Sequence, residues 1–259
     1  MADPLGTTRW LQEQSWKAVE EYLQEDDRII LPVGSTEQHG AFAPLGTDTY
    51  VAQALAEDAS AASSVLVTPP LWFGWSPHHL VKPGTVSIRA EVLIEVLFDV
   101  LSSLAQHGFR RFVVVNGHRI VNIAWMQIAA ERAQRELKVR VALFDPAYMS
   151  KEIVGSLGFG PIGHGEEIEI SHMLYRYPHL VDLRQAKDHA HPSRPLYYLD
   201  PADKRDTLCY VPATREDLQA VADQSGDTIA GRPTQSSARK GKAYHDHLVA
   251  RLLEVLEKL

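Results

Sequence analysis

The chain has 259 residues, 45% hydrophobic and 23% charged, which is the composition of a globular protein large enough to bury a sizeable core. Lys and Arg number 26 against 33 Asp and Glu, so the net charge is −7, and no run of basic residues occurs. This balance argues against nucleic acid and anionic membranes as partners. A single cysteine, Cys209, rules out a disulfide framework, and no apolar run reaches the roughly 18 residues of a membrane span, so we expect a cytoplasmic protein.

Helices and strands alternate through the first 150 residues. Apolar residues at helical spacing predict an amphipathic helix over residues 9–25 and further helices over 50–62, 90–107 and 121–136. Short apolar strands are expected at residues 28–33, 64–68, 111–115 and 138–144. Strand–helix–strand units make parallel sheets, so the pattern predicts one α/β domain over residues 1–259. Its expected form is a three-layer α/β/α sandwich with a mainly parallel sheet.

The remaining segments are less regular. Residues 69–88 are rich in Pro, Gly, Trp and His, and they predict a long loop over the sheet edge. Residues 183–215 are polar with weak periodicity. Further helices are expected near residues 147–156, 166–176 and 236–258.

The carboxyl ends of the predicted strands should face one crevice, into which the loops after residues 33, 68, 115 and 144 converge. The first of these loops carries the clearest motif. Glu37 and His39 lie two residues apart in a glycine-rich turn, and Asp48 precedes the next helix. Asp48 alone has a structural explanation, because the helix dipole favours a carboxylate at a helix N-terminus. The three residues together suit a borderline divalent cation, so we favour a metal site.

Two later segments carry further candidates. The turn Asn-Gly-His at 116–118 ends the most apolar strand, where polar groups are costly unless they have partners. His118 is therefore favoured as a ligand over an exposed turn residue. His164, Glu167 and Glu169 follow a glycine-rich turn and begin a helix. Their spacing leaves open whether the glutamates bind a metal or only stabilise the helix N-terminus.

Several stretches of the chain together resemble the creatininase family of metal-dependent hydrolases. They are LPVGSTEQHGAFAPLGTD, the turn NGH, HGEEIEIS and the tail GDTIAGRPTQSSARKGKAYHDHL, and WFGWSPHHLVKPGTVSI is similar to a loop of that family. The resemblance covers nearly the whole chain. It implies two divalent metal ions, Zn, Mn or Fe, bound by Glu37, His39, Asp48 and His118, with Asp48 bridging them.

The resemblance implies a fifth ligand, a glutamate, in one of two places. Two residues after His118, where creatininase itself has it, this chain has Ile120, which cannot bind a metal. The later family segment H-A-G-x-x-E-T-S, aligned on its histidine and serine, puts the glutamate at Glu169, with Glu167 as the alternative. On the same alignment His164 matches the histidine that the family uses for proton transfer.

Substrate contacts are predicted from the loops around these ligands. Residues 41–43 and 119–122 depart from the family pattern, so substrate choice should be decided there. Trp72 and Trp75 could stack on a flat substrate or could equally serve as core residues. The candidate substrate-binding residues are His79, Trp72, Trp75, Asn116 and Arg119. Four other histidines lack a motif and are expected on the surface or on a helix face: His78, His172, His189 and His191.

The implied ligand set predicts hydrolysis at a carbonyl group. Three carboxylates against two dications leave about one unit of positive charge, which acidifies a bound water. The expected reaction is cleavage of a C–N amide bond in a small, cyclic substrate. The alternatives are C–C hydrolysis that opens an oxidised inositol ring, and a protein that binds metal without turnover. The resemblance also implies a homo-oligomer, commonly a hexamer.

Overall fold

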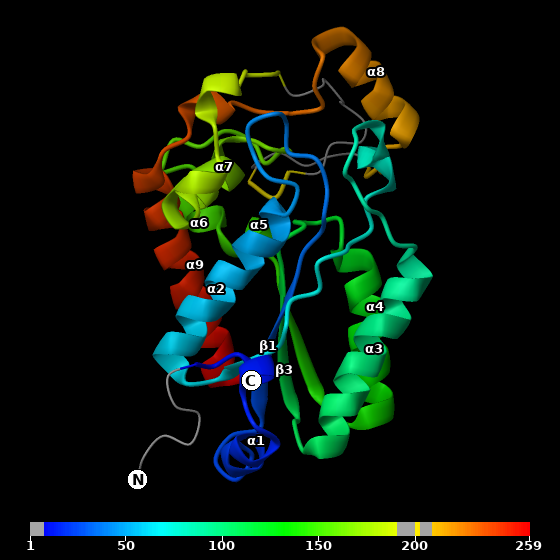
Figure 1. Ribbon diagram of the computed structural model, residues 1–259, viewed down its shortest axis with the longest axis vertical. Helices are drawn as coiled ribbons and strands as arrows, with labels where there is room; N and C mark the ends of the chain where they lie inside the picture. The colour runs from blue at the N-terminus through cyan, green and yellow to red at the C-terminus, as the bar shows by residue number, and fades with distance from the viewer. Residues whose placement is uncertain (1–7, 191–199, 203–208) are drawn as a thin grey trace.

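A sheet of four parallel strands forms the centre of the molecule. The computed structural model describes residues 8–190, 200–202 and 209–259. The strands are β1 (Arg28–Val33), β2 (Leu66–Val67), β3 (Arg111–Asn116) and β4 (Arg140–Phe144), in the order β2-β1-β3-β4 (Figure 1). In the register of the sheet, Ile30 of β1 lies between Val67 and Val113. All four expected strands are confirmed, although β2 is shorter than predicted.

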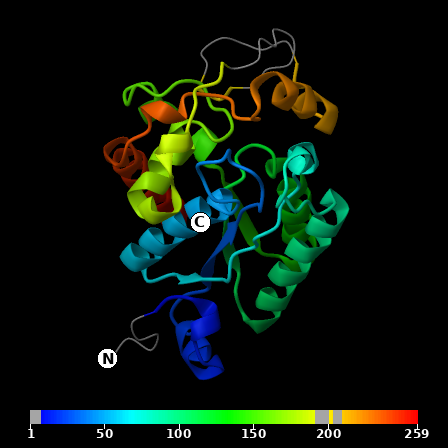
Figure 2. The ribbon, with the colours of Figure 1, turned by 45° about the horizontal axis from the view of Figure 1, so that its top comes forward.

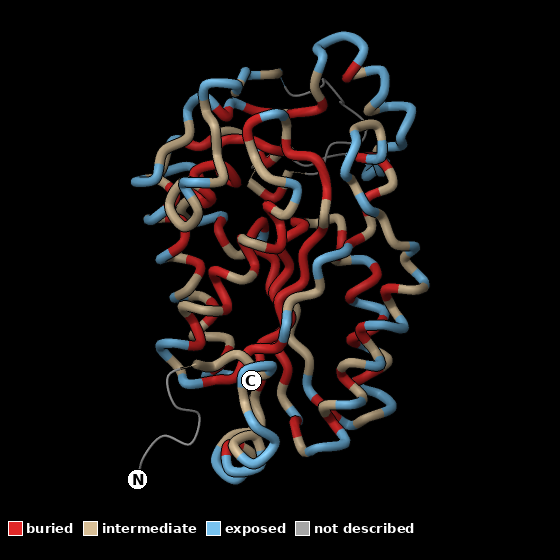
Figure 3. Tube along the Cα trace, in the orientation of Figure 1, coloured by how far each residue is buried: buried red, intermediate tan, exposed pale blue. Residues whose placement is uncertain are grey.

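Helices cover both faces of the sheet. Two pack on each face (Figure 1): α2 (Thr47–Ser63) with α9 (Ala238–Lys258), and α3 (Ala90–His107) with α4 (Ile123–Leu137). Side chains alternate along each strand, so Ile30 and Val113 belong to the first core, and Ile29 and Phe112 to the second. Figure 3 shows β1 and β3 as buried along nearly their whole length. The predicted three-layer α/β/α sandwich is confirmed.

The helix α7 (Glu167–Arg176) packs along α9. At Gly241 of α9, a Cβ atom would lie 1.8 Å from the carbonyl oxygen of Ser171, so the two backbones are in direct contact. The other helices are short: α1 (Trp16–Tyr22), α5 (Pro146–Met149), α6 (Lys151–Val154), α8 (Arg215–Ser225), and the 3-10 helices η1 (Leu11–Glu13), η2 (Pro77–Val81), η3 (Pro178–Leu180), η4 (Leu183–Gln185) and η5 (Pro233–Gln235).

Three predictions of helices differ from the structure. Residues 9–25 do not form one helix, because Ser15 begins a new helix by accepting a hydrogen bond from the backbone N–H of Ala18. Trp16, an apolar residue within that predicted helix, is 71% exposed. The expected helix near 147–156 is divided at Ser150 into α5 and α6. Helix α8 was not expected, although the capping box at its start, formed by Thr214, is a signal that the sequence carries.

The loops after the strands converge at one end of the molecule, as predicted (Figure 2). Val33 pairs with Leu71, and Thr36 pairs with Val86, so residues 69–88 lie against the loop that follows β1. This segment contains η2 and is therefore only partly irregular. Among the described residues, no helix is both long and apolar enough to cross a membrane.

Candidate metal centre

Four buried polar side chains meet at the carboxyl ends of β1 and β3. Glu37 and His39 lie in the loop after β1, Asp48 in the first turn of α2, and His118 in the turn after β3. We call these four residues the strand-end group. None of them is more than 4% exposed. Polar groups with so little access to water are costly unless partners compensate them.

Close backbone contacts place the start of α2 against the strand ends. A Cβ atom at Gly34 would lie 2.2 Å from Thr49 Oγ1, and one at Gly117 would lie 1.8 Å from the backbone oxygen of Asp48. Only glycine permits such approaches. The two contacts fix Asp48 between the loop after β1 and the turn after β3.

Asp48 lies between two histidines. Its Oδ1 is 3.2 Å from His39 Nε2, and its Oδ2 is 3.1 Å from His118 Nδ1. Glu37 Oε1 is 3.3 Å from the same nitrogen of His118. Oδ1 of Asp48 therefore faces His39, whereas Oδ2 faces His118, whose Nδ1 Glu37 also approaches.

Contacts behind the strand-end group orient its two imidazoles. His39 Nδ1 lies 3.1 Å from the backbone oxygen of Glu37, to which it donates, so Nε2 is the nitrogen left to face Asp48. His118 Nε2 is 3.4 Å from Ser76 Oγ, so Nδ1 faces the carboxylates. Contacts of this kind fix the tautomer and ring orientation of metal-binding histidines.

The electrostatics of the strand-end group fit a cation. Both carboxylate oxygens of Glu37, His39 Nε2 and Asp48 Oδ2 are buried without a hydrogen-bond partner among the described residues. Burial lowers the pKa of His39, but the carboxylates of Asp48, Glu169 and Glu37 outweigh it and raise this pKa to about 9. Burial also opposes the charged form of His118, yet Glu37 and Asp48 raise its pKa well above the usual range. The negative potential that attracts these protons would equally attract a metal ion, and the donor atoms suit zinc or manganese.

Three residues lie together around the start of α7, and we call them the helix group: His164, Glu166 and Glu169. His164 and Glu169 approach the strand-end group, whereas Glu166 contacts Arg119. Glu169 Oε2 is 3.7 Å from His39 Nε2. Glu167 points elsewhere, because its two oxygens accept hydrogen bonds from the backbone and the guanidinium of Arg232. The structure therefore brings Glu169, and not Glu167, toward the strand-end group.

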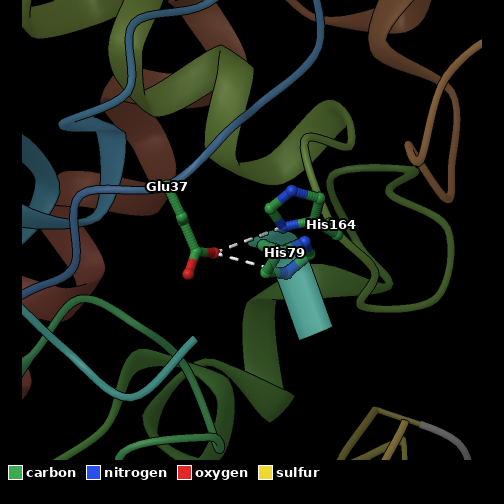
Figure 4. Close-up of side chains that lie close together, drawn as sticks. All are labelled: Glu37, His79 and His164. Carbon is green, nitrogen blue, oxygen red and sulfur yellow. Dashed lines mark ion pairs between the residues drawn. The ribbon is translucent and has the colours of Figure 1, made fainter. Parts of the chain in front are cut away.

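His79 and His164 both approach Glu37 (Figure 4). His79 Nε2 is 3.5 Å and His164 Nδ1 is 3.6 Å from Glu37 Oε1. Their rings stack with centroids 3.9 Å apart. Gln38 contacts both, because its side-chain Nε2 is 3.0 Å from His79 Nδ1 and its backbone oxygen is 2.6 Å from His164 Nε2. Gln38 Nε2 also lies 2.9 Å from His164 Nε2. The backbone oxygen of Gln38 can only accept, so in the shorter contact His164 Nε2 donates, and Nδ1 is the nitrogen that faces the carboxylate.

A cavity of about 210 Å³ opens beside these residues and suits a small ligand. Its apolar lining includes Val121, Ile162 and Leu218, the last from α8. Its polar lining includes His78, His79, His118, Arg119, His164 and Glu169. Both the strand-end group and the helix group therefore contribute to one wall.

Comparison with known proteins agrees with this geometry. The family model for creatininase (creatinine amidohydrolase) matches residues 12–256. The chain belongs to the creatininase family. It is 30% identical to a 3-dehydro-scyllo-inosose hydrolase of Thermotoga maritima over 100% of this chain and 84% of the relative. It is 31% identical to a creatinine amidohydrolase of Pseudomonas putida over 84% of this chain and 90% of the relative.

A solved creatininase structure confirms the fold. This mutant creatininase, described as the Zn–Zn type, is 26% identical to the chain, with a TM-score of 0.77 over 97% of this chain and 98% of that one. The chain is thus a metal-dependent hydrolase with the creatininase fold, and the sequence-based assignment to this family is confirmed.

The substrate residues predicted for this creatininase-family protein lie in different places. His79 and Arg119 line the cavity. The remaining three do not belong to its lining: Trp72 packs edge-on against Tyr50, Trp75 is partly buried against the second core, and Asn116 is fully buried. Asn116 donates hydrogen bonds to the backbone oxygen of His118 and to Asp145, so it holds the turn after β3. Substrate contact by these three residues stays a prediction.

Four residues of the site were missed by sequence reasoning. The prediction of a surface or helix-face position for His78 was wrong, because it is buried, lines the cavity and lies 4.2 Å from His79 between ring centroids. The others, Gln38, Asp145 and Glu166, hold neighbouring side chains or turns. Asp145 did carry a signal, since it directly follows β4 at the carboxyl edge of the sheet. His191 lies outside the described residues.

Proposed function

We propose that this creatininase-family hydrolase uses two divalent metal ions to hydrolyse a bond at a carbonyl group of a small, cyclic substrate. The observation that carries the proposal is the buried strand-end group beside a cavity. In it, both oxygens of Glu37, His39 Nε2 and Asp48 Oδ2 have no hydrogen-bond partner among the described residues. Glu37 and His118 would hold one ion, and His39 and Glu169 the other. Asp48 would bridge them, since its two oxygens face the two sets. The ions would be Zn, Mn or Fe, and the Zn–Zn form of the solved relative supports a pair.

When bound, the metal pair would supply an acidified water as the nucleophile and would polarise the carbonyl oxygen. His164 is placed to move the proton. Its Nε2 donates to the carbonyl of Gln38, so Nδ1, 3.6 Å from Glu37 Oε1, would accept a proton from the water and return it to the departing group. The ring of His79 stacks on that of His164.

The first candidate for the bond is the C–N bond of a cyclic amide. The relative from Pseudomonas putida is named as an amidohydrolase. Amide cleavage requires a proton for the departing nitrogen, and His164 borders the cavity in which that nitrogen would lie.

A second candidate is a C–C bond in an oxidised inositol ring, and the cavity lining favours it. The relative named for 3-dehydro-scyllo-inosose matches over the whole of this chain. Ile120 replaces the glutamate ligand of creatininase itself, and Arg119 introduces a guanidinium beside the cavity. Arg119 Nη1 and the hydroxyl of Thr228 have no hydrogen-bond partner in the described part of the chain. Two such donors beside the cavity suit a substrate rich in oxygen.

Turnover assays on metal-stripped protein reconstituted with zinc or manganese test the proposal. Keto-inositols, lactams and hydantoin-like rings would be compared, with mass spectrometry detecting the addition of one water. We expect metal-dependent turnover of one of these classes and none by Asp48→Asn. Two bound ions without turnover of any class would favour a binding protein. A folded protein that takes up no metal would contradict the proposal.

We also propose that the protein is a homo-oligomer, and the support is the family resemblance alone. A cytoplasmic location stays a prediction from the composition of the chain. Light scattering after size-exclusion chromatography measures its mass in solution. We expect six chains per particle, whereas a monomer at micromolar concentration would contradict the expectation.

A further inference from the structure

Arg119 is a buried cation beside a centre proposed to bind cations. It is 7% exposed and follows His118 in the turn after β3. Its Nε is 3.1 Å and its Nη2 is 2.6 Å from Glu169 Oε1, and Nη2 is also 2.6 Å from Glu166 Oε1. An uncompensated guanidinium in this position would repel metal ions, because buried charges interact strongly at short range.

Glu166 compensates this charge. The residue is fully buried and precedes α7 as its N-cap. Its Oε1 accepts a hydrogen bond from Arg119, and its Oε2 accepts one from the backbone N–H of Glu169 at 3.0 Å. The three ligand carboxylates and two dications carry about one unit of positive charge, and adding Arg119 together with Glu166 leaves that charge unchanged.

The turn that presents Arg119 has an unusual backbone. Ile120 has a φ of +66°, in the left-handed region that a β-branched residue rarely adopts. The backbone N–H of Ile120 donates to Asp145 Oδ2 at 2.7 Å, which holds this conformation. In this backbone conformation, the side chain of His118 faces Asp48 of the strand-end group, while the side chain of Arg119 faces Glu169 of the helix group.

The two oxygens of Glu169 have different surroundings. Arg119 binds Oε1, whereas Oε2 accepts the backbone N–H of Gly165 at 2.8 Å and lies 3.7 Å from His39 Nε2. We propose that Arg119 and Glu166 are positioning residues that hold Glu169 with Oε2 toward His39. The ion that His39 and Glu169 share would then depend on Arg119. This inference rests on the proposed dinuclear function and assigns a role to residues outside its ligand set.

Glu167, the first residue of α7, forms an ion pair with Arg232 that offers a control. Glu167 is buried like Glu169, and Arg232 Nη2 lies 2.8 Å from Glu167 Oε1. This second ion pair is of the same chemical type, on the same helical turn, but Glu167 does not face the strand-end group. Half of the Arg232 side chain is exposed, whereas Arg119 is buried. Arg232→Gln therefore removes an arginine–glutamate contact of the same chemistry, but at a more exposed position, without touching the proposed metal ligands.

Zinc titration of the metal-stripped protein against a competing chelator measures the dependence on Arg119, with circular dichroism to verify folding. We expect the wild type and Arg232→Gln to bind two ions with the same affinities. Arg119→Gln should bind one ion as the wild type does and the other roughly 10–100-fold more weakly, the loss typical when a ligand loses its support. Arg119→Lys, which cannot reproduce the guanidinium fork, should fall between them.

A double variant shows whether Arg119 acts through Glu169. If it does, adding Arg119→Gln to Glu169→Gln should weaken zinc binding no further. Unchanged affinity in Arg119→Gln would overturn the inference, and tighter binding would do so by showing that the guanidinium competes with the ion. If Arg119→Gln does not fold, Arg119→Lys decides by the same criteria. Fewer than two ions in the wild type would contradict the dinuclear proposal itself, and the inference with it.

Discussion

The strand-end group and the helix group are held in place by different means. Backbone contacts place the strand-end group, because Gly34 and Gly117 let α2 approach the ends of β1 and β3 closely. Individual hydrogen bonds place the helix group: Arg119 and the backbone N–H of Gly165 hold Glu169, and the backbone carbonyl of Gln38 holds His164. One group thus follows from the packing of the fold, and the other from a few replaceable contacts.

The difference separates what the fold fixes from what can vary. A change to the backbone contacts of the strand-end group should disturb folding and metal binding together. A change to the helix group should alter the chemistry or one ion while the sheet stays intact. The chain departs from the family pattern at Arg119 and Ile120, which adjoin the helix group.

The largest expected effect is a loss of kcat without a loss of metal on substitution of His164. His164→Ala should lower kcat by about 10²–10⁴-fold, because a general acid–base histidine supplies roughly that factor. Its two metal ions should stay bound, since His164 is not among the five proposed ligands. Steady-state kinetics and metal analysis of the same preparation measure both quantities. Loss of an ion from this variant would make His164 a ligand and would contradict the proposed roles.

A smaller effect tests the backbone contacts of the strand-end group. The methyl group of Gly117→Ala would collide with the backbone oxygen of Asp48, 1.8 Å from the position of the new Cβ. Urea unfolding of the metal-free protein should show a loss of about 1–3 kcal/mol, the usual cost of overpacking. Gly155→Ala is the control, because a Cβ there meets no atom of the described residues within 4 Å. Equal stability of the two variants would show that the backbone contact does not fix Asp48.

The smallest expected effect is a change in the pH dependence of stability, and it concerns a buried histidine between α7 and α9. His172 of α7 is 1% exposed, and its Nε2 is 2.7 Å from His245 Nδ1 of α9. Burial, with the nearby His245, Arg176 and Arg119, lowers the pKa of His172 well below the usual value. Burial also lowers the pKa of His245, although the carboxylate of Asp58 opposes this shift.

These shifts predict that acid destabilises the fold. Below about pH 6.5 the unfolded chain binds a proton at His172 that the folded chain excludes, so stability is present above that pH and is lost as the pH falls. His172→Asn should reduce the pH dependence of the unfolding free energy by up to about 1.4 kcal/mol per pH unit between pH 6 and 5. His179→Asn, at an exposed position outside this packing, is the control for the substitution itself. Identical pH profiles of the wild type and His172→Asn would contradict the burial of a neutral histidine.

Sequence reasoning predicted the parts of the molecule that depend on local pattern. Alternating helices and strands gave the parallel sheet, and strand ends placed Glu37 and His118 at one crevice. Contacts between distant segments have no local signal, which is why Glu166 was not connected with Arg119, 47 residues away. His78 was misplaced for the same reason, since its burial depends on how residues 69–88 fold over the sheet edge.

Anomalous diffraction from zinc-loaded crystals tests the dinuclear centre most directly. We predict two zinc peaks per chain, one beside Glu37 and His118 and the other beside His39 and Glu169, with Asp48 touching both. A single peak, or a pair in which Asp48 contacts only one ion, would contradict the account.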